Sequence, residues 1–131
     1  RGMHRHLAGD VDLCTVALGA NDMMQRVAVD AVTRNLNAIL DRLAARGIPA
    51  LLCGMRAPPW FGLYALAFDR VFGEIARRRD LPFDPFLLEG VALNPAFVLP
   101  DRTHPNAKGV EATARRPAPR VAAVLSRLAT T

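Results

Sequence analysis

Short apolar runs alternate along this chain with longer stretches in which apolar residues recur at helical spacing. Residues 11–18 are almost entirely apolar, and residues 48–55 form a second run of the same kind. Short continuous runs of this composition are typical of parallel strands that are buried on both faces. Residues 81–86 form a third and weaker run, since two prolines interrupt it. The pattern therefore predicts three short buried strands.

Two amphipathic helices are predicted between these runs. Residues 30–46 are followed by Gly47, a residue type that commonly ends a helix in the left-handed conformation. Residues 63–79 form the second helix, and residues 1–9 are predicted as the frayed end of a further one. The positions expected to face the core in the two complete helices are Val32, Leu36, Ile39, Leu40, Leu43, Leu66, Val71, Phe72 and Ile75.

Prolines define the remaining segments. Residues 56–62 are predicted as a loop because adjacent prolines cannot sit in a central strand. Residues 86–100 are predicted to be irregular. A last helix is expected from Pro105, with a break at Pro117, because a proline inside a helix costs about 3 kcal/mol. The helix should resume over residues 119–128.

The order strand, helix, strand, helix, strand, helix is typical of an α/β fold with a parallel sheet and right-handed crossovers. A chain of 131 residues suits one domain, and we predict a single domain over residues 1–131. Sites in such folds lie beyond the carboxyl ends of the strands. We therefore expect any chemistry in the loops that begin near residues 19, 55 and 86.

Composition narrows the classes of function. The chain is 51% hydrophobic and 22% charged, which is typical of a globular protein, and it has no apolar run long enough to span a membrane. Its net charge of +5 comes from scattered arginines, so a nucleic-acid partner is not favoured. Cys14 and Cys53 are expected to be small buried hydrophobes, and His4 and His6 surface residues. No cofactor or metal site is predicted.

The segment Asp101-Arg-Thr-His104 places a carboxylate and an imidazole three residues apart, just before the last helix. Asp101 could accept a hydrogen bond from one ring nitrogen and so orient His104 as a general base. The alternative is that Asp101 caps the following turn while His104 is a surface residue.

A second candidate motif, Gly19-Ala-Asn-Asp22, directly follows the first predicted strand. Gly19 would allow a close turn of the backbone, and the Asn21 amide could donate to a developing oxyanion. The alternative is ordinary turn chemistry, in which Asn21 or Asp22 caps a helix.

Taken together, these motifs resemble those of the SGNH or GDSL hydrolases, in particular their multifunctional thioesterase, lysophospholipase and arylesterase branch. The resemblance extends over residues 10–128 and includes Gly54-Met-Arg-Ala-Pro-Pro59 and Pro85-Phe-Leu-Leu-Glu-Gly90. It implies a flavodoxin-like three-layer α/β/α fold and hydrolysis of small-molecule acyl esters or thioesters through a Ser-His-Asp triad.

The resemblance also implies roles for individual residues. His104 would be the base, Asp101 its orienting acid, and Asn21 an oxyanion-hole donor, while Asp22 would be structural. Substrate-binding residues would be Gly19, Arg56, Trp60 and Phe61, with the two aromatic rings offering apolar surface to the substrate. The alternative is that these two aromatic residues only cover the core and bind no substrate.

The family's Gly-Asp-Ser motif, which bears the nucleophile, is absent from this sequence. The single serine, Ser126, falls inside the last predicted helix, and Thr15, Thr103 and Cys14 are poorly placed for the role. We therefore expect the chain to be the C-terminal part of a hydrolase that lacks the N-terminal strands. The serine would lie on a segment outside it, either upstream in the same polypeptide or on a separate N-terminal fragment. A catalytically inactive binding or assembly module is the alternative. Localisation stays open, with export to the periplasm or beyond slightly favoured because relatives are often exported.

Overall fold

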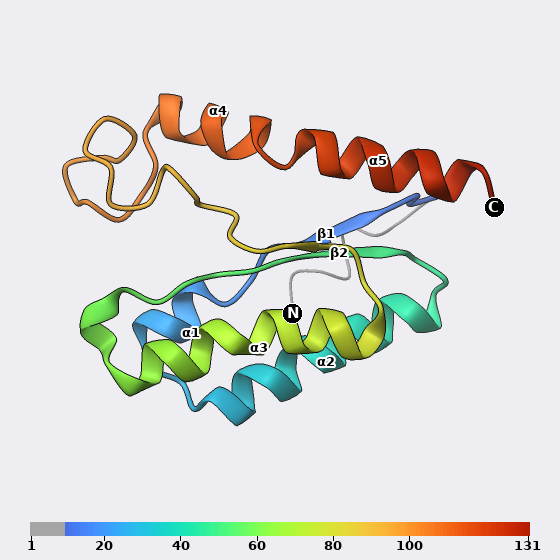
Figure 1. Cartoon of the computed structure of the whole chain (residues 1–131), viewed down its shortest axis with the longest axis horizontal. Coiled ribbons are helices and arrows are strands. Elements are labelled where there is room, and N and C mark those ends of the chain that lie inside the picture. Colours follow the sequence, from blue (N-terminus) through green and yellow to red (C-terminus); the bar gives the residue numbers. More distant parts are fainter. Residues whose placement is uncertain (1–9) are drawn as a thin grey trace.

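The computed structural model describes residues 10–131, in which a three-stranded parallel sheet lies between two layers of helices (Figure 1). The strands are β1 (Cys14–Val16), β2 (Ala50–Cys53) and β3 (Phe83–Asp84), with β2 in the middle. The register pairs Thr15 with Leu51 and Leu52 with Phe83. The predicted parallel sheet and three-layer α/β/α class are confirmed.

Helices α1 (Ala20–Met24), α2 (Val29–Ala45) and α3 (Leu63–Arg79) lie on one side of the sheet. Helices α4 (Ala107–Arg115) and α5 (Ala118–Ala129) cover the other side (Figure 1). A short 3₁₀ helix, η2 (Pro59–Phe61), lies within the predicted loop after β2. Within residues 10–131, no helix has the length and apolar character needed to cross a membrane.

The main core lies between the sheet and the pair α2 and α3. Phe68 and Phe72 of α3 are fully buried and pack edge to face, with ring centroids 5.3 Å apart. Leu43 of α2 and Leu52 of β2 belong to the same cluster. On the opposite side of the sheet, Val124 is the large apolar side chain of α5 that becomes buried. Burial of a side chain of this size stabilises the fold by roughly 1.5–3 kcal/mol.

The core predictions hold with one exception. Val32, Leu36, Leu40, Leu43, Val71, Phe72 and Ile75 are buried, and Ile39 is partly buried against them. Leu66 was expected in the core but is 60% exposed, so that prediction is wrong. It precedes Ile75 by about two and a half helical turns, which places it on the opposite face of α3. Phe68 takes the inward position instead.

The helix ends follow the sequence signals. Gly47 adopts a left-handed φ of 66° just after α2, and its N–H donates to the carbonyl of Ala44. Pro117 separates α4 from α5, so the predicted break is present. The strands are shorter than predicted, because only two to four residues of each apolar run pair with a neighbour. The expected helix over residues 1–9 lies outside the described part of the chain.

Candidate active site

The segments that follow the three strands gather at one end of the molecule, on the left in Figure 1. They are α1 after β1, the segment of residues 54–62 after β2, and the long connection of residues 85–106 after β3. This is the carboxyl end of a parallel sheet, where sites of α/β proteins are found. The predicted site residues all come from these three segments.

Asp101 and His104 are in direct contact in the last of these segments. His104 Nδ1 lies 2.7 Å from Asp101 Oδ2. Asp101 Oδ1 accepts hydrogen bonds from the backbone N–H groups of Thr103, at 2.9 Å, and His104, at 3.0 Å. One carboxylate oxygen therefore caps the turn while the other engages the imidazole. The two interpretations of this motif, turn cap and ring partner, are thus compatible.

These hydrogen bonds also determine the charge of Asp101. The backbone N–H of His104, the His104 side chain and the backbone N–H of Thr103 lower the pKa of Asp101 from 3.8 to about 2. The carboxylate is therefore ionised at neutral pH and favours the imidazole tautomer that carries its proton on Nδ1. In that tautomer Nε2 has a free lone pair, which is what a general base requires.

Asn21 occupies the second position of α1, immediately beyond the turn after β1. Gly19 makes this turn with a φ of 116°, and a Cβ atom there would lie 3.0 Å from Cζ of Phe72. Only glycine meets both conditions without strain. Asn21 is exposed, and its side chain makes no hydrogen bond to any part of the chain that the structure describes. The amide is thus available to a ligand.

The capping alternative for this motif is not what the structure shows. Gly19 is the N-cap of α1, and no side chain supplies a cap hydrogen bond there. Asp22 lies in the first turn, where a negative charge interacts favourably with the N-terminal end of a helix.

The segment after β2 contributes the remaining predicted residues. Arg56 is exposed, with its guanidinium carbon 5.6 Å from the centroid of the Phe86 ring. Trp60 is 67% exposed. Phe61 is partly buried, with the guanidinium of Arg26 4.2 Å from its centroid. Trp60 therefore presents open apolar surface, whereas Phe61 is largely occupied by neighbours within the protein.

The side chains that could act as alternative nucleophiles are either distant from the site or poorly reactive. Ser126 is near the C-terminal end of α5, which runs toward the opposite end of the molecule (Figure 1). Burial raises the pKa of the Cys14 thiol. Burial and the charge of Asp84 raise the pKa of Cys53 to about 11. Neither thiol is a thiolate at neutral pH, and only a thiolate is an effective nucleophile.

One cavity lies away from this end. A cavity of about 440 Å³ is lined by Leu40, Ile48 and Leu81, near the amino ends of the strands and far from the candidate site along the sheet. Among residues 10–131, no group of three or more His, Cys, Asp or Glu side chains could hold a metal ion. His4 and His6 lie outside the described residues.

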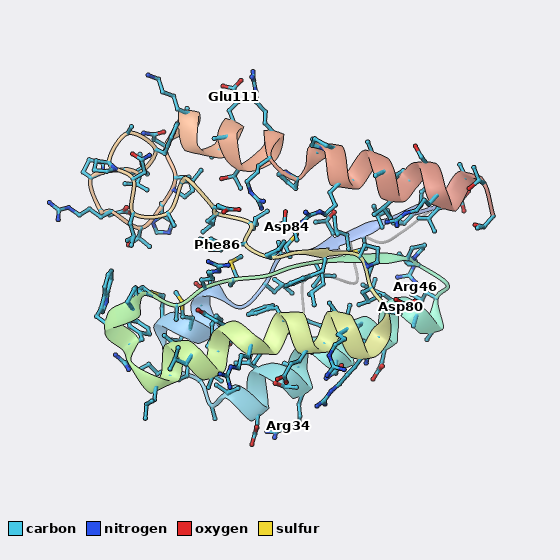
Figure 2. All side chains as sticks on the ribbon, viewed as in Figure 1. Arg34, Arg46, Asp80, Asp84, Phe86 and Glu111 are labelled. Atoms are coloured by element: carbon cyan, nitrogen blue, oxygen red, sulfur yellow. The ribbon has the colours of Figure 1, made fainter. Side chains whose placement is uncertain are left out.

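An ion pair that was not predicted from the sequence joins the sheet to the last two helices. Asp84 of β3 is fully buried, beneath α4 and α5 in Figure 2, and Arg116 Nη2 lies 2.6 and 2.7 Å from its two carboxylate oxygens. The signal in the sequence was an aspartate inside an apolar run. Its partner, 32 residues later, had no signal of its own.

The sequence and the fold match known proteins. Residues 1–112 match the model of the GDSL-like lipase/acylhydrolase family. Over 94 residues the chain is 34% identical to Esterase TesA of Pseudomonas aeruginosa, covering 71% of this chain and 47% of that protein. Over 92 residues it is 33% identical to "Thioesterase 1/protease 1/lysophospholipase L1" of Escherichia coli K12, covering 70% and 44%.

Among solved structures, AlinE4, described as an SGNH-hydrolase family esterase, superimposes with a TM-score of 0.69 at 37% identity, covering 92% of this chain and 65% of that one. The chain spans about half the length of the curated relatives it matches. Because the family model covers most of the chain, and its relatives share both sequence and fold, this protein belongs to the GDSL-like lipase/acylhydrolase family, as its motifs indicated.

Proposed function

We propose that this chain is the base-bearing part of a serine hydrolase that cleaves acyl esters or thioesters. The observation that carries the proposal is the 2.7 Å contact between His104 Nδ1 and Asp101 Oδ2, at the carboxyl end of the sheet. Asn21 stands at the same end, on the segment after β1. A base with its orienting acid and an amide donor at the same end of the sheet are groups that acyl transfer needs.

In the proposed mechanism, His104 Nε2 removes the proton from a serine hydroxyl as its oxygen attacks the acyl carbon. The Asp101 carboxylate stabilises the imidazolium that forms. The Asn21 amide donates to the oxyanion of the tetrahedral intermediate, and His104 then protonates the departing alcohol or thiol. In the second half of the reaction, His104 removes a proton from a water molecule as it attacks the acyl-enzyme. His104 then returns a proton to the departing serine oxygen. General acid–base catalysis of this kind contributes about 10²–10⁴-fold to the rate.

The nucleophile is proposed to lie on a segment outside these 131 residues, upstream in the same polypeptide or on a separate chain. Within the sequence, the only serine is Ser126, which lies in α5 away from the site. That observation favours the alternative function, a catalytically inactive module kept for binding or assembly. The two functions differ in whether the complete gene product forms an acyl-enzyme.

The substrate class is proposed from the neighbouring residues and from the relatives. Trp60 offers an exposed apolar ring beside the site, and Arg56 a cation, so an acyl chain or aromatic group next to a polar head would suit them. Gly19 and the exposed part of the Phe61 ring would also contact the substrate. The names of the relatives, an esterase and a thioesterase/lysophospholipase, support an oxygen or sulfur ester.

A fluorophosphonate probe tests the proposal, because it labels an activated serine covalently. The full-length gene product should be labelled on a peptide outside the present sequence. His104→Ala should abolish labelling and turnover of p-nitrophenyl and acyl-CoA esters, whereas Ser126→Ala should leave both unchanged. Absence of labelling and turnover in the correctly folded full-length product would reject the proposal in favour of the inactive module.

A further inference from the structure

The turn that holds Asp101 and His104 is closed by its own backbone. The Leu99 N–H donates to the carbonyl of His104 at 2.7 Å, and the Arg102 N–H donates to the carbonyl of Leu99 at 2.9 Å. Val98 and Pro105 form an antiparallel bridge at the base of this turn. The position of the imidazole therefore depends on how residues 96–98 and 105–106 are held together.

The Asn106 side chain joins these two segments of the connection, residues 96–98 and 105–106. Its Nδ2 donates to the carbonyl of Ala96 at 3.0 Å and lies 3.5 Å from that of Val98. Its Oδ1 accepts from the backbone N–H of Gly109 at 3.0 Å, as the N-cap of α4. Its own backbone N–H donates to the carbonyl of Phe97 at 2.9 Å. Asn106 thus joins the connection to the first turn of α4.

The packing between these parts leaves little room for adjustment. A Cβ atom on Gly109 would lie 2.1 Å from the carbonyl oxygen of Phe97 and 3.1 Å from Cβ of Pro105. The first turn of α4 is therefore in direct backbone contact with the base of the turn. Because the first turn of α4 packs directly against residues 97 and 105, it restricts the movement of these residues.

We infer that Asn106 is a positioning residue for His104, because its amide N–H₂ ties the base of the turn that holds the imidazole against Asp101. The inference deepens the proposed function and rests on it for its catalytic meaning. Asn106 need not touch substrate. Asn106 lies two residues after His104, and its effect passes to the imidazole through the backbone of residues 96–98 and 104–105.

Asn106 has two roles: its Oδ1 caps α4, and its Nδ2 holds residues 96–98 beside the turn. Substitutions can separate the effects of these two roles on His104. Asn106→Asp keeps an oxygen acceptor for the Gly109 N–H, and aspartate caps helices as well as asparagine does. It cannot donate to the carbonyls of Ala96 and Val98. Asn106→Ala removes both functions. Asn94→Ala is the matched control, since Asn94 also bonds the backbone of this connection on both sides, at Gly90 and Ala96.

The readout is the tautomer of the His104 ring, measured in the full-length protein by long-range ¹H–¹⁵N NMR, with the signals assigned by their absence in His104→Gln. The unsubstituted neutral ring should be protonated on Nδ1. Asn106→Asp and Asn106→Ala should move it toward the Nε2-protonated form, and Asp101→Asn should do the same. Asn94→Ala should not. Circular dichroism checks that each variant is folded.

The inference would be overturned if a folded Asn106→Asp protein kept the His104 tautomer of the unsubstituted protein. It would also be overturned if Asn94→Ala shifted the tautomer as much as the Asn106 variants do. In turnover assays, Asn106→Asp should lower kcat by on the order of 10–100-fold with KM little changed, as expected when a reacting group is misplaced. The proposed function can fail separately: an unsubstituted protein that holds the Nδ1 tautomer but has no turnover would reject hydrolysis and leave the positioning role of Asn106 intact.

Discussion

The buried ion pair between Asp84 and Arg116 gives the sharpest prediction for stability. Asp84 is fully buried and accepts two hydrogen bonds from Arg116 Nη2, whose side chain is 26% exposed. The backbone N–H of Phe86 also donates to this carboxylate, at 3.2 Å. Arg120 lies 3.7 Å from it but is 43% exposed, so water can solvate that guanidinium. Arg116 is therefore the partner on which the charge of Asp84 depends.

Removal of one member of such a pair leaves the other charge without its main partner, and Asp84 would then be a fully buried carboxylate. We expect Asp84→Ala and Arg116→Ala each to lower the free energy of unfolding by about 3–5 kcal/mol. The double replacement Asp84→Leu with Arg116→Met should cost much less than the sum, because apolar residues of similar volume often replace a buried ion pair at little cost. Urea unfolding monitored by circular dichroism measures each value.

Helix α4, which ends just before Arg116, supplies a matched control. Arg115, next in sequence to Arg116, pairs with Glu111 one turn away, and both side chains are mostly exposed. Glu111→Ala should cost no more than about 0.5 kcal/mol. If Asp84→Ala proved as mild as Glu111→Ala, or if the apolar double variant were less stable than both single alanine variants, then burial would not be what makes this pair important.

Three further changes should give clear results. Gly19→Ala should cost about 2–4 kcal/mol in urea unfolding, because it adds a contact with Phe72 to a left-handed backbone, whereas Gly47→Ala, which meets no atom within 4 Å, should cost only about 1 kcal/mol; equal costs would contradict this. Arg102 has a φ of 57°, so Arg102→Gly should raise stability by about 0.5–1 kcal/mol, and a decrease would show that the turn is not strained. The folded-state pKa of Asp101, about 2, lies below its ordinary 3.8, so its contribution to stability is present above pH 3.8 and is lost as the pH falls to about 2. Asp101→Asn should flatten the stability curve across that window, and an unchanged slope would contradict the hydrogen bonds described.

The four longer helices, α2 to α5, were predictable from local patterns, whereas the short α1 and η2 were not predicted. Residues 63–79 were predicted as a helix and α3 spans the same residues, because its apolar positions recur with the helical period and Gly62 precedes it. The strands were predicted too long, since an apolar run does not reveal which of its residues find a hydrogen-bonded neighbour. Pairing of β1 with β2 joins residues more than thirty positions apart, such as Val16 and Leu52. That information lies in the tertiary fold.

The candidate site shows the same division between local and distant contacts. Asp101 and His104 are three residues apart, and their spacing within one turn already suggested the contact that the structure contains. The bond from Asn106 to Ala96 spans ten residues of irregular backbone, and the pair of Asp84 and Arg116 spans 32. Neither of these two contacts produces a repeating sequence pattern, so neither could be predicted from the sequence.

The exposure of the proposed catalytic pair, His104 and Asp101, explains why such connections are needed. The side chains of His104 and Asp101 are 72% and 47% exposed, so water competes for their hydrogen bond. A pair of this kind gains little from its own attraction and cannot hold its geometry unaided. The geometry must instead come from the backbone, through the Thr103 N–H that fixes the Asp101 carboxylate and the Asn106 amide that closes the turn. The catalytic competence proposed for this site is therefore a property of the whole connection between β3 and α4.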